Sequence, residues 1–162
     1  MSTDEIRKRV FLRAPRSRVW EALIDSKKFG TWFGCAFEGP FEVGARLHAR
    51  VVPTAVDSEV ARVQAACETE AFDILVDRIE PMTRFSFRWH PGAEVPEPPF
   101  PDAEMTTVTF ELADAEGGVL LTITESGFDR VPLERRAKVF ETNEGGWAAQ
   151  AELIEKFLRD AT

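Results

Sequence analysis

The stretch TVTFELADAEGGVLLTIT, residues 107–124, decides the fold. Its apolar residues alternate with polar ones on both sides of a glycine pair at 117–118; they are Val108, Phe110, Leu112, Val119, Leu121 and Ile123. Two runs of period two that flank glycines are typical of a β-hairpin. Threonines fill much of the opposite face, so the hairpin is expected to have one buried and one solvated side.

Working outward, the same alternation returns in residues 6–12, 46–51, 72–77 and 84–90. A short amphipathic helix is predicted after Pro15, followed by one more helical turn or a tight loop at 29–34. A long helix is predicted from about Pro132, and its apolar residues recur every seven positions or less: Phe140, Trp147, Ala151, Ile154 and Leu158. The order of elements predicts an α+β protein whose helices cover one face of an antiparallel sheet of about six to seven strands.

Several finer expectations follow from the same reading. The solvated face of the sheet is predicted to carry Thr107, Thr109, Thr122, Thr124, Ser86 and Arg88. The pair Gly145-Gly146 interrupts the long helix and is expected to allow close approach of helix and sheet. Residues 53–71 fit either a helix or an extended hairpin, and residues 91–104, with five prolines, are expected to form a stiff loop at the rim of a site.

Length and charge narrow the class of protein. A chain of 162 residues fits one domain covering residues 1–162. The net charge of −8 disfavours nucleic acid and anionic membranes as partners. Two cysteines, Cys35 and Cys67, and no apolar run of spanning length predict a cytoplasmic protein with reduced thiols. A homodimer stays open.

Five stretches carry a resemblance to a known superfamily: WFG at 32–34, RIEP at 78–81, FSFRWHP at 85–91, LTITESGF at 121–128 and NEGGW at 143–147. The chain resembles the START-like helix-grip (Bet v 1-like, SRPBCC) superfamily, and within it the branch named for the C-terminal domain of the Hsp90 ATPase activator. The resemblance extends over nearly the whole chain. It implies a curved sheet that grips the C-terminal helix, with two short helices after the first strand and an elongated cavity inside.

Glu125 is the most informative polar residue. Strand parity puts it on the side of Leu121 and Ile123, which is expected to be interior. A carboxylate there would serve as a ligand anchor, hydrogen-bond donor or proton shuttle. The alternative is a solvated position at the end of the strand, close to Gly127.

Two amides of the long helix share the stripe of Trp147. Asn143 precedes it by four positions and Gln150 follows it by three, so both are expected to face the sheet. Inside a cavity they would orient a carbonyl or hydroxyl group of a ligand. They would equally serve to cap backbone groups that the glycine pair frees.

Aromatic residues supply the rest of the predicted site. The chain has 13 Phe, 4 Trp and no Tyr, so its aromatic surface is nearly all apolar. Six rings are candidates either for the core or for ligand contact: Trp32 and Phe33 near the mouth, and Phe87, Trp89, Phe110 and Trp147 in the interior.

No pattern indicates a metal or a cofactor. His48 shares the polar side of its strand and His90 stands before Pro91, and neither belongs to a cluster with metal-ligand spacing. Cys35 is expected to be a buried, inert thiol. Phosphate-binding and dinucleotide-binding fingerprints are not found in the sequence.

Three functions stay open. The first is binding of a small, largely apolar or amphipathic molecule in the cavity, with Glu125 and Asn143 setting its orientation. The second is an enzyme of the cyclase, dehydratase or hydrolase kind in which Glu125 acts as general acid or base. The third, implied by the resemblance, is an Hsp90 co-chaperone; it is disfavoured, because 162 residues leave no room for the activator's separate Hsp90-binding domain.

Overall fold

The computed structural model describes residues 5–66, 71–91 and 101–160. It contains seven strands, four helices and two short 3₁₀ turns: β1 (Glu5–Leu12), α1 (Arg16–Ile24), α2 (Ser26–Phe33), β2 (Cys35–Phe37), β3 (Arg46–Val51), α3 (Ser58–Ala65), β4 (Ala71–Glu80), β5 (Arg84–Trp89), η1 (Asp102–Glu104), β6 (Thr106–Ala115), β7 (Gly118–Ser126), η2 (Phe128–Arg130) and α4 (Leu133–Asp160).

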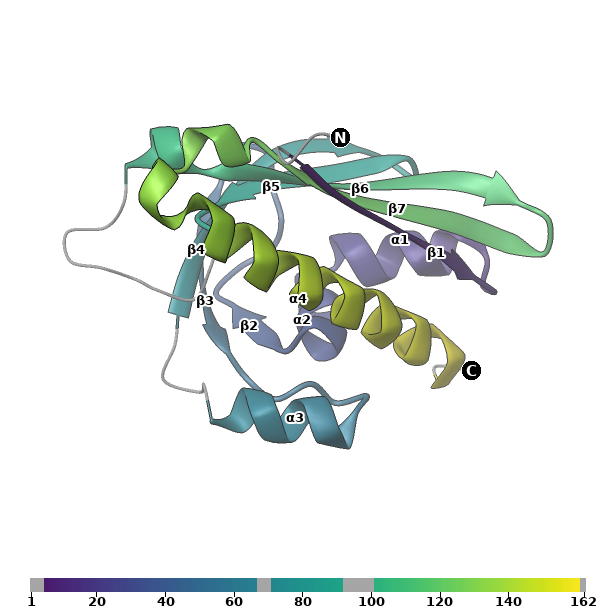
Figure 1. Cartoon of the computed structure of the whole chain (residues 1–162). Coiled ribbons are helices and arrows are strands. Elements are labelled where there is room, and N and C mark those ends of the chain that lie inside the picture. Colours follow the sequence, from purple (N-terminus) through teal and green to yellow (C-terminus); the bar gives the residue numbers. More distant parts are fainter. Residues whose placement is uncertain (1–4, 67–70, 92–100, 161–162) are drawn as a thin grey trace.

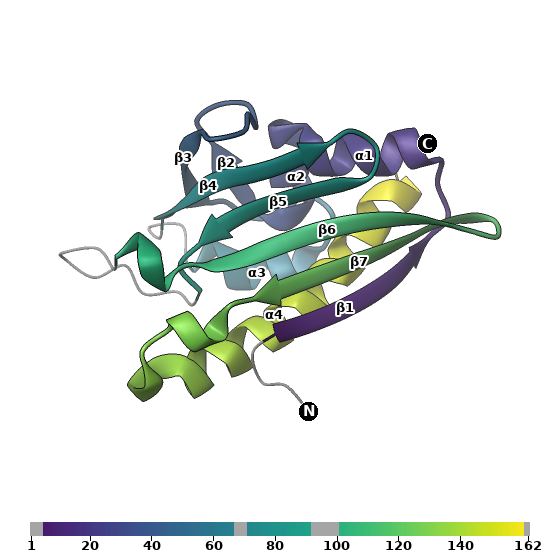
Figure 2. The same cartoon turned by 90° about the horizontal axis from the view of Figure 1, so that it is seen from above.

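The seven strands form one sheet in the order β1-β7-β6-β5-β4-β3-β2, and every neighbouring pair is antiparallel. The first strand therefore lies beside the last, and the remaining strands follow one another as a meander. Figures 1 and 2 show the sheet curving over the long helix α4. The α+β helix-grip architecture predicted from the sequence is confirmed.

Helices α1, α2 and α4 lie on the same face of the sheet (Figure 1). The apolar stripe of α4 is buried against it through Trp147, Ala151, Ile154 and Leu158. The hairpin residues of the predicted inner face are all buried, and they belong to the same hydrophobic core as this stripe. Removal of this apolar surface from water is the main stabilising contribution to such a fold.

Short polar residues set the helix ends. Asp25 stands between α1 and α2, and its Oδ1 accepts hydrogen bonds from the backbone N–H groups of Lys27 and Lys28 at 2.9 and 3.1 Å. Gly34 ends α2 with a φ of 96°, a left-handed conformation that favours glycine. Asp57 caps α3 in the same way as Asp25 caps α2.

For the region 53–71 the sequence left a helix and an extended hairpin open. The structure has a helix, α3, over residues 58–65. Residues 67–70, with Cys67, and residues 92–100 of the proline-rich loop lie outside the described residues. The role of the proline-rich loop at the rim of a site stays a prediction.

The structure corrects two finer expectations. The helix α4 is continuous through Gly145 and Gly146, and a Cβ on either glycine would meet nothing within 4 Å. The pair lies on the exposed side, so it does not allow closer packing on the sheet. Ser86, expected to be solvated, is only 2% exposed, because Asp77 on the adjacent strand covers it and accepts its hydroxyl hydrogen bond at 3.1 Å.

Candidate functional site

The carboxylate of Glu125 is fully buried near the end of β7. Leu121 and Ile123 precede it on the same side of the strand and are buried too, so strand alternation carries the side chain inside. Two residues later Gly127, with a φ of 91°, turns the chain out of the strand. Glu125 is therefore the last inward residue of β7, at the edge of the core.

Four side chains donate hydrogen bonds to this carboxylate. Its Oε2 accepts from Trp89 Nε1 at 2.8 Å and from Thr106 Oγ1 at 2.5 Å. Its Oε1 accepts from Asn143 Nδ2 at 2.9 Å and from Trp147 Nε1 at 2.8 Å. We call Glu125 and these four donors the carboxylate cluster.

Strand register and helix periodicity together build the cluster. Trp89 at the end of β5 is paired directly with Thr106 at the start of β6, and β7 is the next strand. Asn143 and Trp147 are four positions apart on α4, so they lie one above the other on one face. Each donor depends on the pairing of sheet and helix that the fold provides.

The hydrogen bonds compensate for the burial of Glu125. An ionised carboxylate has about four acceptor positions, and the four donors fill them. None of the ion pairs found among the described residues includes Glu125. A hydrogen bond to a charged group contributes about 1.5–3 kcal/mol, and leaving a buried charge without its partners costs more. The neutral donors therefore replace the water and the cation that a buried carboxylate otherwise needs.

A group of rings lies beside the carboxylate cluster. The centroid of the Phe33 ring is 6.2 Å from Trp89 and 6.0 Å from Trp147, and the two indoles are 5.8 Å apart. Phe72 of β4 contacts Trp89 edge to face at 5.8 Å. Phe33, Phe72 and Trp89 are only partly buried, so these rings present apolar surface beyond the core. We call Phe33, Phe72, Trp89 and Trp147 the ring group.

Three of the predicted ligand-contact residues lie deeper. Trp32, Phe87 and Phe110 are at most 1% exposed and pack among other rings of the core. Trp32 was expected near the mouth, but it lies on the inner side of α2, where its Nε1 donates to the carbonyl of Ala22 at 2.9 Å. These side chains form the floor beneath the ring group.

Two members of the site were missed in the sequence. Thr106 has the parity of Val108 and Phe110, but its position before the clear alternation concealed its inward direction. Phe72 was recognised as an inward strand residue without being assigned to the site. The period of two, extended by one step from Val108, identifies Thr106.

Gln150 faces the sheet side of α4, as predicted, and caps a helix end. Its Nε2 donates to the backbone carbonyl of Phe33 at 3.1 Å. The Nε2 of Gln64 in α3 donates to the same carbonyl at 3.0 Å. The capped carbonyl belongs to the last turn of α2, not to the backbone near Gly145-Gly146.

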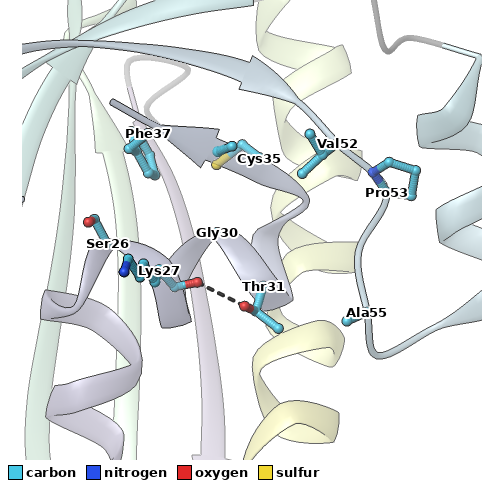
Figure 3. Close-up of a pocket in the computed structure, with 10 residues that line it drawn as sticks. Ser26, Lys27, Gly30, Thr31, Cys35, Phe37, Val52, Pro53 and Ala55 are labelled. Carbon is cyan, nitrogen blue, oxygen red and sulfur yellow. Dashed lines mark hydrogen bonds between the residues drawn. The ribbon is translucent and has the colours of Figure 1, made fainter. Parts of the chain in front are cut away.

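A separate, partly open pocket of about 320 Å³ lies between α2, β2 and the segment after β3 (Figure 3). Lys27 and Thr31 of α2, Cys35 and Phe37 of β2, and Pro53 are among its lining residues. None of the predicted ligand-binding residues lines it, so it is distinct from the site at Glu125.

In the described part of the chain, the remaining chemistry-bearing residues do not form a second centre. Cys35 is 3% exposed, and burial raises the pKa of its thiol, which keeps it protonated and unreactive. His48 is exposed and its Nδ1 lies 2.9 Å from Asp73. Across residues 5–66, 71–91 and 101–160, no three His, Cys, Asp or Glu side chains gather in a way that would hold a metal ion.

Comparison with known proteins gives a family and a fold. Residues 13–159 match the family described as Activator of Hsp90 ATPase homolog 1-like protein. Curated proteins give no match to the chain. In the part of the chain that the structure describes, no helix is both long and apolar enough to cross a membrane.

Several solved structures share the fold. DynU16, a protein of the dynemicin biosynthetic locus, is 25% identical with a TM-score of 0.66; the match covers 98% of this chain and 48% of DynU16, so this chain spans about half of that protein's length. Protein MLL2253 from Mesorhizobium loti is 21% identical with a TM-score of 0.69, and the match covers 98% of each chain. A protein from Arthrobacter aurescens is 18% identical with a TM-score of 0.72, covering 99% of this chain and 88% of that one.

The family match includes the stretches FSFRWHP and NEGGW, on which the resemblance was based. The solved structures named above share the fold of this chain. The resemblance drawn from the sequence is therefore confirmed. This chain belongs to the family of activator of Hsp90 ATPase homolog 1-like proteins, a branch of the START-like helix-grip superfamily.

Proposed function

We propose that the protein binds a small, largely apolar molecule against the ring group, between the sheet and α4. The observation that carries the proposal is the partial exposure of Phe33, Phe72 and Trp89 directly beside a fully buried, fully hydrogen-bonded carboxylate. Aromatic side chains that remain partly exposed next to fixed polar groups are typical of ligand sites. The fold of the family fits a ligand-binding or cyclase-type role.

In this proposal Glu125 acts through its neighbours. Its four acceptor positions are occupied, so it holds the two indoles and the Asn143 amide in place for the ligand. Asn143 is partly exposed and is the polar member of the carboxylate cluster that a ligand would meet. Trp147 and the floor of Trp32, Phe87 and Phe110 would support the ring group from below.

An enzyme of the cyclase type is the second candidate. It is supported by the burial of a carboxylate beside aromatic surface and by the 25% identity with DynU16, which comes from a biosynthetic locus. For Glu125 to act as general acid or base, one of its four donors must first leave it, because no acceptor position faces a substrate. The binding role needs no such rearrangement, and we prefer it.

The test of the proposed function is a search for bound material followed by a titration. Native mass spectrometry of the purified protein, compared with its denatured mass, is expected to show a ligand that denaturation releases. Titration with the neutral dye Nile red is expected to show saturable binding that Phe72→Ala weakens by about tenfold, since the lost ring buries much of its surface against the dye.

Phe11→Ala is the matched control. Phe11 is also partly buried, but it lies next to the β6–β7 turn, near Gly117 and Gly118. Equal loss of Nile red binding in both variants would show that the dye senses general destabilisation, and the proposal would lose its support. A cytoplasmic location stays a prediction from the sequence, and an Hsp90 co-chaperone role stays the disfavoured alternative.

A further inference from the structure

The orientation of the Asn143 amide is fixed by Glu125. Oε1 of Glu125 accepts hydrogen bonds here, so the amide turns its donor, Nδ2, toward this oxygen, at 2.9 Å. Its other end, the carbonyl oxygen Oδ1, then points away from the carboxylate. Within the described part of the chain this oxygen accepts no hydrogen bond, and the side chain is partly exposed. Asn143 therefore offers an acceptor.

The orientation of the Gln150 amide is fixed by the backbone carbonyl of Phe33. The Phe33 carbonyl can only accept, so Gln150 turns its Nε2 toward that oxygen, at 3.1 Å. The carbonyl oxygen Oε1 is buried and has no hydrogen-bond partner among the described residues. A buried acceptor without a donor is destabilising, and a donor brought by a ligand would remove that cost.

The two acceptors flank the rings. Asn143 and Gln150 are seven positions apart on α4, which corresponds to two turns and about 10.5 Å along the axis. Trp147 lies between them on the same face, and the Phe33 ring is 6.0 Å from Trp147. An apolar molecule on these rings would thus have an amide oxygen near each end.

The side chains of the region also disfavour a ligand that carries a carboxylate. The carboxylate cluster contains the Glu125 carboxyl group, and its other members are neutral side chains that donate hydrogen bonds to it. Two cations of α4 are already engaged by carboxylates: Arg135 by Glu104 and Lys156 by Asp57. A ligand carboxylate, which can only accept hydrogen bonds when ionised, would meet acceptor oxygens at both amides.

We propose, building on the binding function above, that the site selects flat, neutral molecules with hydroxyl or amino groups and excludes carboxylates. The hydroxyl or amino hydrogens donate to Asn143 Oδ1 and Gln150 Oε1, while the ring group covers the apolar body. Asn143 and Gln150 are the residues that determine this selectivity.

Three compounds with one ring system test the selectivity of the unmodified protein. 2-Naphthol has a donor hydroxyl, 2-methoxynaphthalene keeps the oxygen without a donor, and 2-naphthoate is anionic at neutral pH. In calorimetric titrations 2-naphthol is expected to bind about tenfold tighter than 2-methoxynaphthalene, the value of one well-made hydrogen bond. 2-Naphthoate is expected to bind more weakly than both.

A pair of glutamine variants identifies the acceptor. Gln150→Met keeps length and volume but removes the acceptor, and it is expected to reduce the preference for 2-naphthol over 2-methoxynaphthalene. Gln64→Met is the control, because Gln64 donates to the same Phe33 carbonyl but its own oxygen is used by the backbone N–H of Thr54 at 2.7 Å. It is expected to keep the preference.

The outcomes separate the two proposals. If no naphthalene compound binds, the proposed binding function fails. If the three compounds bind equally, or if 2-naphthoate binds best, the function stands and the donor selectivity is wrong. A preference that is unchanged in Gln150→Met would show that Gln150 does not contribute to the selectivity.

Discussion

Glu125 joins parts of the chain that are far apart in sequence, because its donors come from β5, β6 and α4. Each donor bonds to a carboxyl oxygen that is buried away from water, where a hydrogen bond is stronger than at the surface. The stability of the cluster should therefore depend on the number of donors, and this can be measured at Trp147.

We expect Trp147→Phe to lower the free energy of unfolding by about 1 kcal/mol more than Trp32→Phe does. Both indoles are at most 2% exposed and both pack against rings, so the loss of volume is matched. The difference is the acceptor: Trp147 donates to the Glu125 carboxylate and Trp32 to the Ala22 carbonyl. Urea denaturation measures both losses, and equal values would mean that the charge of Glu125 adds nothing to the bond.

For single residues, the sequence predicts which way a side chain points better than it predicts the hydrogen-bond partners of that side chain. Strand parity was enough to turn Glu125 inward, and helical spacing put Asn143 and Trp147 on the inner face of α4. It could not show that Trp89 and Thr106 meet the same carboxylate, because that depends on the register between β5 and β6. Register is a property of the paired strands and of the turn that joins them.

Among the elements, glycine has opposite consequences at two kinds of position. Gly34 ends α2 in a left-handed conformation, and a Cβ there would lie 2.2 Å from the Gln64 side chain. Gly145 and Gly146 lie inside α4, where a Cβ would meet only open space. The sequence contains the same residue in each case, and only the backbone angle distinguishes them.

We expect Gly145→Ala and Gly146→Ala to raise the free energy of unfolding by about 0.5–1 kcal/mol each, because alanine favours the helix interior. Gly34→Ala is expected to lower it by about 1 kcal/mol or more, since φ is 96° and Gln64 must move. Thermal unfolding of the three variants measures the signs. Destabilisation by the α4 substitutions would indicate that the exposed glycines serve a contact outside the described residues.

The helix α3 is attached to the rest of the fold by polar contacts at both ends. Asp57 caps its first turn and pairs with Lys156 of α4, while Gln64 near its last turn bonds to the Phe33 carbonyl. The hydrogen bond from Lys156, followed by that from the Val60 N–H, holds the pKa of Asp57 below its ordinary value of 3.8. These bonds stabilise the fold when Asp57 is ionised.

The sign of the pH dependence follows from the lowered pKa. The contribution of Asp57 is fully present above 3.8 and is lost as the pH falls through the lower value in the folded state. We expect the melting temperature of the wild type to fall more than that of Asp57→Asn between about pH 5 and pH 2, because asparagine caps the helix but does not titrate. Parallel curves for the two proteins would show that the ion pair does not contribute.

For the whole molecule, the sequence predicted the architecture because hairpin alternation, the long apolar stripe and the five resemblance stretches agree with one another. The division of the aromatic residues between core and surface could not be predicted in the same way. Phe33 and Trp32 are neighbours in sequence, yet one is partly exposed and the other fully buried. Which side of α2 faces the sheet depends on how α2 packs on β2, and this is decided by tertiary contacts.

The rate at which the buried Cys35 thiol reacts with an added reagent shows whether the core opens as one unit. It lies on the edge strand β2, it is 3% exposed, and burial raises the pKa of its thiol. In a Cys67→Ser background, we expect Ellman's reagent to modify Cys35 at least about four thousandfold more slowly than in the unfolded chain. The reason is that global opening costs at least about 5 kcal/mol.

The dependence of this rate on urea distinguishes two ways of opening. If Cys35 is exposed only by global unfolding, the rate rises with the full denaturant slope of the equilibrium transition. Fast modification with little urea dependence would mean that β2 separates locally from β3. Cys35 would then become accessible through the pocket that it lines together with Lys27 and Pro53. In that case the edge of the sheet beside α2 would be the least stable part of the helix grip, and the ring group at Phe33 would adjoin a mobile element.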